Sequence, residues 1–462
     1  MIRTIYDRSP TLLQNAFTTL YGYQLHALRY GGTYKRHLEQ LEQSQWWPRE
    51  RLHEFQLNLL RRLLIHAHEH VEFYRERFRQ ADFHPNDLKS TEDLLKLPIL
   101  TREDVLRNAE RMVADNCSRS RLRQHFTSGT TGTPLRFYED KDAVRRNYAF
   151  WMRFRRWFGF KEWLPRATFG GRVVVPRSQD RPPYWRYNHA EKQLVFSSFH
   201  LSDETLPAYI ERLERFSPFL IDGYVSTIFT LARYINRQAI TTVRPSAVQT
   251  TSETLFDFQR REIEEAFQCK VYNQYGQGEK VAFISECEHG QLHVNDEYGI
   301  VEIVKDGLLA RPGETGEIIA TSFTNWVMPL IRYQTGDLAV ASAAPSCPCG
   351  RGLSVVESIE GRVIDVLRMP DGKIVPPTAL TLLFDKASAM GIDQAQVCQV
   401  AYDQIVVKLV PRSSEAAPDT RGLESDLRMM MGDKVKIQFE MVAHISSTEA
   451  GKFKFVVSEL PD

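Results

Sequence analysis

Short apolar runs alternate with amphipathic helical stretches between residues 125 and 345, and this alternation constrains the fold more than any other feature. The stretches between the runs repeat apolar residues three or four positions apart, which is the spacing of a helix face. Such alternation predicts an α/β fold with a largely parallel core sheet, because parallel strands need a crossover between them. The expected strands are 167–175, 219–224, 246–252, 270–276 and 316–322, and the expected helices are 207–216, 226–238 and 255–267.

The regions on either side of this alternating segment have a different pattern. Residues 1–115 are expected to be mostly helical and to pack on the larger domain, with Pro48 and Thr101 at positions that suit helix starts. Residues 290–321 have the pattern of hairpins. A break rich in Cys, Pro and Gly at 346–362 precedes a block that predicts a small α+β domain at 363–462.

Composition excludes several classes of protein. The 462 residues include 59 Lys and Arg against 58 Asp and Glu, so the formal charge is +1, which argues against general nucleic-acid binding. With 42% hydrophobic residues the chain is not mostly disordered. No apolar run approaches the ~18 residues of a membrane-spanning helix, and the first residues do not have a signal-peptide pattern. We therefore expect a soluble, cytoplasmic protein without an integral membrane segment.

A loop rich in threonine and glycine, FTSGTTGTP, runs from Phe126 to Pro134. Glycines let a backbone approach a ligand closely, while hydroxyls and backbone N–H groups donate hydrogen bonds to phosphate oxygens. The segment is not a Walker loop, since no Gly-Lys-Ser/Thr follows. Its composition alone fits a phosphate site or a flexible loop.

Further motifs follow this loop in a fixed order. They are NQYGQGEK at 273–280, IRYQTGDLA at 331–339, GRVID at 361–365 and AGKFKF at 450–455. Together with the loop they resemble the adenylate-forming (acyl-AMP) ligase superfamily, and most closely its phenylacetate–CoA ligase branch, including relatives from polysaccharide gene clusters. The resemblance covers about residues 90–462. It implies an ATP- and acyl-binding core of the large domain at 116–362 and a mobile lid domain at 363–462.

The resemblance also implies roles for individual residues. Tyr275 matches the residue that stacks on adenine, with Gly276 continuing that motif, and Asp337 matches the carboxylate that accepts the ribose hydroxyls. Glu279 matches the family's Mg²⁺ ligand. A carboxylate suits this role, since Mg²⁺ is a hard cation that takes oxygen ligands and neutralises phosphate charge. The loop that holds the β- and γ-phosphates matches Ser128, Gly129, Thr130, Thr131 and Gly132, of which Thr131 is also a catalytic candidate. A weaker match to the adenine-edge loop falls on Ser252, Glu253 and Thr254.

The domain junction and the catalytic lysine come from the same resemblance. Arg362 and Asp365 match the junction, with Arg362 beside the nucleotide and Asp365 at the hinge about which the small domain rotates. Lys452 matches the lysine that stabilises negative charge as a carboxylate attacks the α-phosphate. Lys454 is the local alternative, and Lys452 is preferred because Gly451 precedes it.

Cysteines and histidines form a second set of candidates. Cys287, Cys347, Cys349 and either His293 or His289 have the thiolate and imidazole groups that suit tetrahedral Zn²⁺, with His293 preferred. Some members of the resembling branch carry a comparable structural zinc. The alternative is free buried thiols beside a surface histidine. Four protein ligands would leave no open position, so the site would be structural.

An aromatic and basic segment at 145–163 is expected to pack its apolar face into the core. A second aromatic segment at 174–188 lies where the acyl pocket is usually built, so Tyr184, Trp185 and Arg186 are speculative substrate contacts.

These expectations combine into one function. The chain is predicted to activate a carboxylic acid with ATP and Mg²⁺ as acyl-AMP and to transfer the acyl group to coenzyme A. The alternative acceptor is an amine or hydroxyl, on a sugar or an amino acid. A non-catalytic nucleotide-binding scaffold is the alternative from another class. The sequence leaves the acid undefined and allows a monomer or a homodimer.

Overall fold

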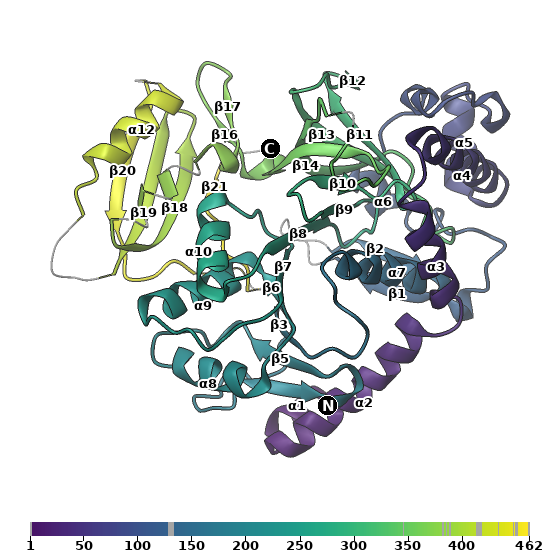
Figure 1. Cartoon of the computed structure of the whole chain (residues 1–462). Helices are drawn as coiled ribbons and strands as arrows, with labels where there is room; N and C mark the ends of the chain where they lie inside the picture. Colours follow the sequence, from purple (N-terminus) through teal and green to yellow (C-terminus); the bar gives the residue numbers. More distant parts are fainter. Residues whose placement is uncertain are drawn as a thin grey trace.

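Two sheets organise the molecule in the computed structural model. A 13-stranded sheet runs through the larger part, and a four-stranded sheet lies in the smaller part, which the C-terminal segment of the chain builds (Figure 1). The structure describes residues 2–127, 134–344, 346–380, 383–384, 386–387, 390–412, 418–432, 434–446, 448 and 451–460.

The α-helices are α1 (Ile2–Arg8), α2 (Thr11–Tyr30), α3 (Tyr34–Ser44), α4 (Arg49–His70), α5 (Glu72–Gln80), α6 (Arg102–Asn108), α7 (Lys141–Trp157), α8 (Leu206–Phe216), α9 (Val225–Arg237), α10 (Asp257–Phe267) and α12 (Arg421–Met431). Short 3-10 helices are η1 (Pro85–Asp87), η2 (Thr91–Lys96), η3 (Arg119–Arg121), η4 (His189–Glu191), η5 (Val363–Asp365) and η6 (Pro377–Leu380).

The strands of the large sheet are β3 (Arg166–Gly170), β4 (Trp185–Asn188), β5 (Gln193–Ser197), β6 (Leu220–Tyr224), β7 (Ala247–Thr251), β8 (Val271–Gly276), β9 (Phe283–Glu286), β10 (Leu292–Val294), β11 (Gly299–Lys305), β12 (Leu308–Leu309), β13 (Thr315–Ser322), β14 (Tyr333–Ala341) and β15 (Val355–Arg362). Two hairpins stand apart, β1 (Arg123–Phe126) with β2 (Arg136–Glu139) and β16 (Leu367–Arg368) with β17 (Ile374–Val375). The small sheet contains β18 (Ile392–Ala401), β19 (Gln404–Pro411), β20 (Lys436–Met441) and β21 (Val456–Ser458).

The large sheet has two halves of different pairing. Its order is β12-β11-β13-β14-β15-β10-β9-β8-β7-β6-β3-β5-β4. The strands from β8 through β7, β6 and β3 to β5 are parallel, and helices α8, α9 and α10 cross between them. The strands from β8 to β12 are antiparallel. The predicted α/β class is confirmed, and the parallel core is one half of a mixed sheet.

One predicted strand is too long. The sequence favoured a strand over 167–175, but β3 ends at Gly170 and residues 173–175 lie outside any strand. Two successive glycines, Gly170 and Gly171, weaken strand pairing at this point. The chain then turns toward α1, where the hydroxyl of Tyr6 donates to the carbonyl of Val174 at 2.6 Å.

The parallel strands have one apolar and one polar face. Ile221 and Val248 point into the main hydrophobic cluster with α8, α9 and α10, and α7 covers the opposite face (Figure 1). On the α7 side the middle of β6 carries Asp222 and the paired position of β7 carries Gln249, both buried. Arg155 of α7 donates to both, at 2.8 Å to Asp222 and 3.0 Å to Gln249.

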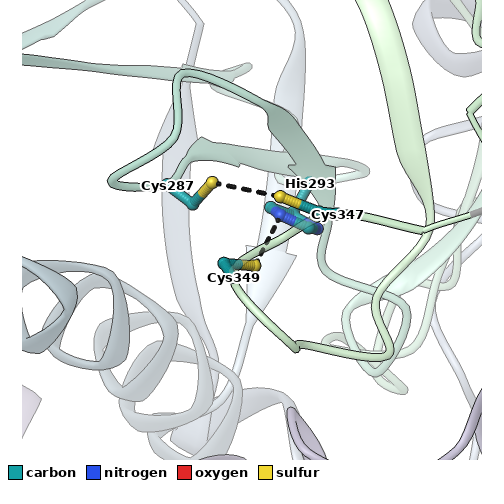
Figure 2. Close-up of side chains that lie close together, drawn as sticks. All are labelled: Cys287, His293, Cys347 and Cys349. Carbon is teal, nitrogen blue, oxygen red and sulfur yellow. Dashed lines mark hydrogen bonds between the residues drawn. The ribbon is translucent and has the colours of Figure 1, made fainter.

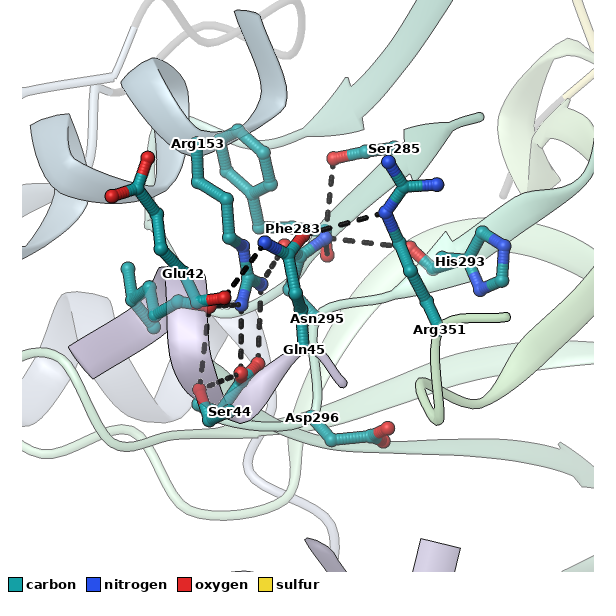
Figure 3. Close-up of polar contacts among 12 residues, drawn as sticks. Glu42, Ser44, Gln45, Arg153, Phe283, Ser285, His293, Asn295, Asp296 and Arg351 are labelled. Carbon is teal, nitrogen blue, oxygen red and sulfur yellow. Dashed lines mark hydrogen bonds and ion pairs between the residues drawn. The ribbon is translucent and has the colours of Figure 1, made fainter. Parts of the chain in front are cut away.

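Helix α7 also ties the N-terminal helices to the sheet. Its N-cap Asp140 accepts from the backbone N–H of Ala143 at 2.7 Å, which fixes where the helix begins. Farther along, the fully buried Arg153 donates at 3.1 Å to the carbonyl of Leu41 in α3 and at 2.7 Å to Glu297 (Figure 3). The segment 145–163 therefore packs inward, and its arginines enter the core as well as its apolar residues.

The C-terminal sheet packs on the large domain through aromatic rings. Phe256, which precedes α10, has its ring centroid 5.0 Å from that of Phe455 and 5.7 Å from that of Phe384. Buried residues of both parts form one hydrophobic cluster. Among the residues that the structure describes, no helix combines the length and apolar character needed to cross a bilayer.

Candidate active site and candidate metal centre

The ends of β8 and β15 and the middle of β14 bring three predicted nucleotide contacts together. Tyr275, near the end of β8, donates its hydroxyl hydrogen bond to Asp337 Oδ2 at 2.7 Å. Arg362, the last residue of β15, faces Asp337 in the β14–β15 register, and its Nε lies 3.6 Å from Asp337 Oδ1. Gly336 before Asp337 has a φ of +73°, a conformation that glycine adopts without strain.

Burial raises the pKa of both Asp337 and Tyr275. It raises the pKa of Asp337 to about 6, while the Arg362 guanidinium acts in the opposite direction. Burial first, and then the charge of Asp337, raise the pKa of Tyr275, which therefore stays a neutral hydrogen-bond donor. A hydroxyl of a ligand could replace Tyr275 as a donor to Asp337.

Glu279 lies beside the start of the threonine-rich loop. The hydroxyl of Tyr333 donates to Glu279 Oε1 at 3.2 Å. A Cβ at the neighbouring Gly278 would lie 3.1 Å from Thr127 Cγ2, so Thr127 packs against this turn. Backbone hydrogen bonding between Thr127 and Leu135 at 3.1 Å closes the two ends of the loop. The predicted phosphate contacts Ser128, Gly129, Thr130, Thr131 and Gly132 lie outside the described residues.

Lys452 comes from the small domain to the edge of the parallel strands. Its Nζ donates to the carbonyl of Ser252 at 3.1 Å and lies 5.4 Å from the ring centroid of Tyr224. Ser252 follows β7 directly and has a φ of +69°. Burial lowers the pKa of Lys452, and the charges of Glu253 and Asp337 oppose that shift. The lysine, the aspartate and the ends of β6 and β7 therefore belong to one site.

Glu253 holds the two domains together at this point. Its carboxylate accepts from the backbone N–H of Ser226 at 2.7 Å and from the backbone N–H of Phe453 at 3.1 Å. Burial raises the pKa of Glu253. Thr254 lies on the same turn, since its Oγ1 would be 3.4 Å from a Cβ at Gly361. The sequence-predicted set 252–254 thus joins α9, β15 and the C-terminal domain.

The two candidate lysines have different partners. Lys454 forms an ion pair with Asp365, at 2.9 Å between Nζ and Oδ1, inside the small domain and its junction. Lys452 instead faces Ser252 and Tyr224 of the large domain. Lys452 therefore contacts the large domain, whereas Lys454 lies at the junction, and the catalytic role of Lys452 stays a prediction.

Three cysteines and one histidine form a cluster beside the β9–β10 turn, namely Cys287, His293, Cys347 and Cys349 (Figure 2). The Sγ atoms of Cys287 and Cys347 lie 3.6 Å apart, and Cys349 Sγ lies 3.3 Å from His293 Nε2. The four ligand atoms all lie within 4.8 Å of one another. Zinc–sulfur bonds of ~2.3 Å at tetrahedral angles would separate two sulfurs by about 3.7 Å, so the cluster fits zinc.

His293 is the histidine that completes this cluster. Its Nδ1 lies 3.3 Å from the carbonyl of Leu353, which would fix the tautomer and leave Nε2 as the ligand. Burial lowers the pKa of His293 to about 4, so the imidazole is neutral near pH 7. The side chain of His289 is exposed, and only its backbone N–H approaches Cys287 Sγ, at 3.4 Å.

Two expectations about substrate contacts change here. Arg186 is fully buried and donates to Gln14, Gln179 and backbone carbonyls, while Tyr184 is buried and its hydroxyl donates to the carbonyl of Asp180. Trp185 packs on the main hydrophobic cluster. These side chains stabilise the fold, so substrate contact at 184–186 is not supported. Sequence reasoning missed Tyr224 and Tyr333, although both lie within segments that it had singled out.

Comparison with known proteins gives relatives over the whole chain. Residues 367–459 match the family model described as the CapK C-terminal domain. Protein CapK of Staphylococcus aureus is 28% identical over 464 residues, covering 100% of both chains. A phenylacetate-coenzyme A ligase of Thermus thermophilus is 25% identical over 352 residues, covering 71% of this chain and 74% of that protein.

Solved structures show the same fold. A 2-hydroxyisobutyryl-CoA ligase in the postadenylation state, in complex with R3-HIB-AMP, has a TM-score of 0.72 at 18% identity, covering 90% of this chain and 92% of the other. The same ligase in the thioesterification state, with 2-HIB-AMP and CoA, has a TM-score of 0.57 at 19% identity, covering 90% and 91%.

The relatives and structural neighbours are of the family and enzyme class that the order of the motifs predicted. The expected class, an AMP-forming carboxylate ligase, is confirmed, while its acid and its acceptor are not thereby defined. This chain is related in sequence to CapK and to the phenylacetate–CoA ligases, and it shares the fold of an adenylate-forming (acyl-AMP) ligase.

Proposed function

We propose that this protein joins a carboxylic acid to ATP and then transfers the acyl group to the thiol of coenzyme A. In the first step a carboxylate oxygen forms a bond to the α-phosphorus, and the bond to the bridging oxygen breaks as pyrophosphate leaves. In the second step the thiol sulfur bonds to the acyl carbon, the carbon–oxygen bond to AMP breaks, and the thiol proton goes to solvent.

One observation supports this proposal, namely that Lys452, at Ser252 after β7, and Asp337, bonded to Tyr275 near the end of β8, belong to one site. Asp337 would accept the ribose hydroxyls, and Tyr275 would stack on the adenine. Lys452 would place its positive charge where negative charge develops on the α-phosphate and the carboxylate. Such preorganised charge in a partly desolvated site is the usual large contribution to this kind of catalysis.

Two metal ions belong to the proposal. Glu279, half-buried beside Thr127, would hold Mg²⁺, which neutralises phosphate charge as pyrophosphate leaves. Cys287, His293, Cys347 and Cys349 would hold a structural Zn²⁺, since four protein ligands complete a tetrahedron. The zinc site would pin the β9–β10 turn to the segment before β15.

We propose that the acid is short and polar, because the α7 face of the parallel strands carries buried polar side chains near the site. Beyond Tyr224 and Thr251, the next positions on the same face are Asp222 and Gln249, and Arg155 bridges them. An aryl or long fatty chain entering along this face would bury these charged and polar groups against carbon and leave them without partners. A small acid that carries hydroxyl or amide groups could share their hydrogen bonds.

A pyrophosphate-release assay with Mg-ATP tests the proposal. We expect release with short hydroxylated or amidated acids, little with phenylacetate or fatty acids, and consumption of the acyl-AMP when coenzyme A is added. Consumption of the acyl-AMP only when an amine or a hydroxyl compound is added, such as a sugar or an amino acid, would identify the alternative acceptor in place of the thiol. Absence of release with every acid, in protein that still binds ATP, would favour a nucleotide-binding scaffold.

A further inference from the structure

Helix α2 turns its polar side toward the protein. Gln14 is buried, and its side chain donates to the carbonyls of Tyr6 and Ser9 at 2.9 and 3.0 Å. Asn15 Oδ1 accepts from the backbone N–H of Tyr187 at 2.9 Å, and Thr19 Oγ1 accepts from that of His189 at 3.2 Å. One turn farther, Gly22 is buried where a Cβ would collide with Asn188.

The opposite side of α2 is apolar and exposed. Positions 13, 17, 20 and 21 recur at helical spacing, and their exposed fractions are 50% for Leu13, 44% for Phe17, 62% for Leu20 and 54% for Tyr21. Leu12 beside them is 79% exposed, and Ile5 of α1 is 55% exposed. The pattern of an ordinary surface helix is thus inverted, which indicates an apolar environment outside the folded chain.

The net charge of the N-terminal helices indicates which kind of apolar surface the outward face of α2 contacts. Over α1 and α2, residues 2–30, the basic residues are Arg3, Arg8 and Arg29, and Asp7 is the only acidic residue, so 3 − 1 gives +2. The rest of the chain has 56 basic and 57 acidic residues, a net charge of −1. Arg29 pairs internally with Glu191 at 3.4 Å, while Arg8 is exposed. The neighbouring loop, held to α1 through Tyr6 and Val174, adds the exposed Arg172 and Arg181 and the exposed Asp180.

We propose that α1 and α2 dock on an anionic lipid surface, with the outward face of α2 in the boundary between headgroups and acyl chains. An apolar helix face flanked by basic residues binds anionic membranes in the interfacial plane without spanning them. A second copy of this face would bring two basic segments together, which opposes self-association through the same stripe. This inference does not depend on the identity of the acid or the acceptor.

Sedimentation with vesicles tests the inference on the full chain. We expect the protein to partition onto vesicles of phosphatidylglycerol mixed with phosphatidylcholine, and more weakly onto phosphatidylcholine alone. Combining Leu13→Gln, Phe17→Gln and Leu20→Gln should lower the partition coefficient ~10-fold or more, because three inserted apolar groups are lost. The Arg8→Gln change should lower it about fivefold at low salt.

Matched variants distinguish vesicle binding by this face of α2 from non-specific binding through other exposed apolar residues. Leu308→Gln with Leu309→Gln removes exposed leucines from β12, 69% and 45% exposed, and should leave binding unchanged. Replacing Leu13 and Leu20 by Met should retain binding and control for folding, checked by the thermal midpoint. The triple Gln variant could fail to fold. In that case, vesicle binding of the Arg8→Gln variant, and of the wild type and the Met variant at increasing salt, still tests the inference.

Three results would overturn the inference. The first is a wild-type protein that stays in the supernatant with anionic vesicles at low salt. The second is equal loss of binding in the β12 variant. The third is a lipid-free dimer, seen in sedimentation velocity, that the triple Gln variant converts to monomer, because a second copy would then be the occupant.

Discussion

Lys452 and Lys454 are two residues apart, yet they face different domains. Lys452 Nζ donates to the carbonyl of Ser252, whereas Lys454 pairs with Asp365. Lys452 is the one of the two that contacts the turn after β7. The positive φ of Gly451, +78°, and its contact with the ring of Phe199 leave no room for a larger residue before Lys452.

We predict that Lys452→Ala lowers the rate of acyl-AMP formation ~10²-fold or more, because it removes charge that stabilises the transition state. Pyrophosphate release under saturating ATP measures this rate. Lys454→Ala serves as the matched control and should retain most of it. Equal losses in the two variants would mean that Lys452 acts through the domain contact rather than on the phosphate.

A pH dependence should follow from Asp337, whose pKa burial raises to about 6. The carboxyl is neutral below that pH and ionised above it, and only the ionised form accepts two ribose hydroxyls. We expect the affinity for adenosine, a ligand without titrating phosphates, to increase as pH rises through about 6. Calorimetry on wild type and on Asp337→Asn measures it, and a pH dependence that persists in Asp337→Asn contradicts the assignment.

At the scale of single residues the sequence was informative where a motif was compact. The segments 273–280 and 331–339 named Tyr275 and Asp337, and the fold brings both together. The sequence did not indicate Arg155 or Asp222, because their contact depends on which face of α7 meets which face of β6. Residues 184–186 illustrate the converse, since aromatic and basic composition resembles a pocket although the side chains are internal.

Among the secondary-structure elements, the pairing of β10 with β15 explains the cysteine cluster. His293 lies opposite Val355 in this pairing, so the segment just before β15, with Cys347 and Cys349, returns to the β9–β10 turn. No sequence spacing encodes this return, because it results from strand pairing over 60 residues. The sequence could therefore name the ligands and leave the choice of histidine open.

Removal of one ligand tests the metal centre. We predict about one zinc per chain in the purified protein, and Cys349→Ser should lose the metal and lower the thermal midpoint, because bound metal stabilises the folded state. Cys117→Ser, outside the cluster, should change neither quantity. Metal-free wild-type protein with an unchanged midpoint after chelation would leave these three cysteines and His293 without a metal role.

The whole molecule depends on how the small domain sits on the large one. The ring of Phe455 contacts Phe256 of the large domain and Phe384 of its own domain, with centroids 5.0 and 4.9 Å apart. The sequence does not indicate this packing, because the rings of Phe256 and Phe455 come from segments that lie far apart in the chain.

Weakening this interface should affect the two half-reactions differently. We predict that Phe455→Ala slows acyl-AMP formation ~10-fold, since about one large apolar contact between the domains is lost. Transfer from supplied acyl-AMP should not slow, because in the proposed mechanism the small domain rotates away from this contact before that step. Phe439→Ala, within the small domain's own sheet, controls for loss of domain stability. Parallel losses in both half-reactions would contradict a specific role of the interface.

Both ends of the long sheet are closed to further strands. At one end β12 has only two residues, and at the other the side chains of Asn15 and Thr19 occupy the backbone groups of Tyr187 and His189 beside β4. Unpaired strand edges are where folded proteins add neighbours and polymerise. Each end of the long sheet therefore offers another chain only a short stretch of unpaired backbone, which limits growth of the sheet from molecule to molecule.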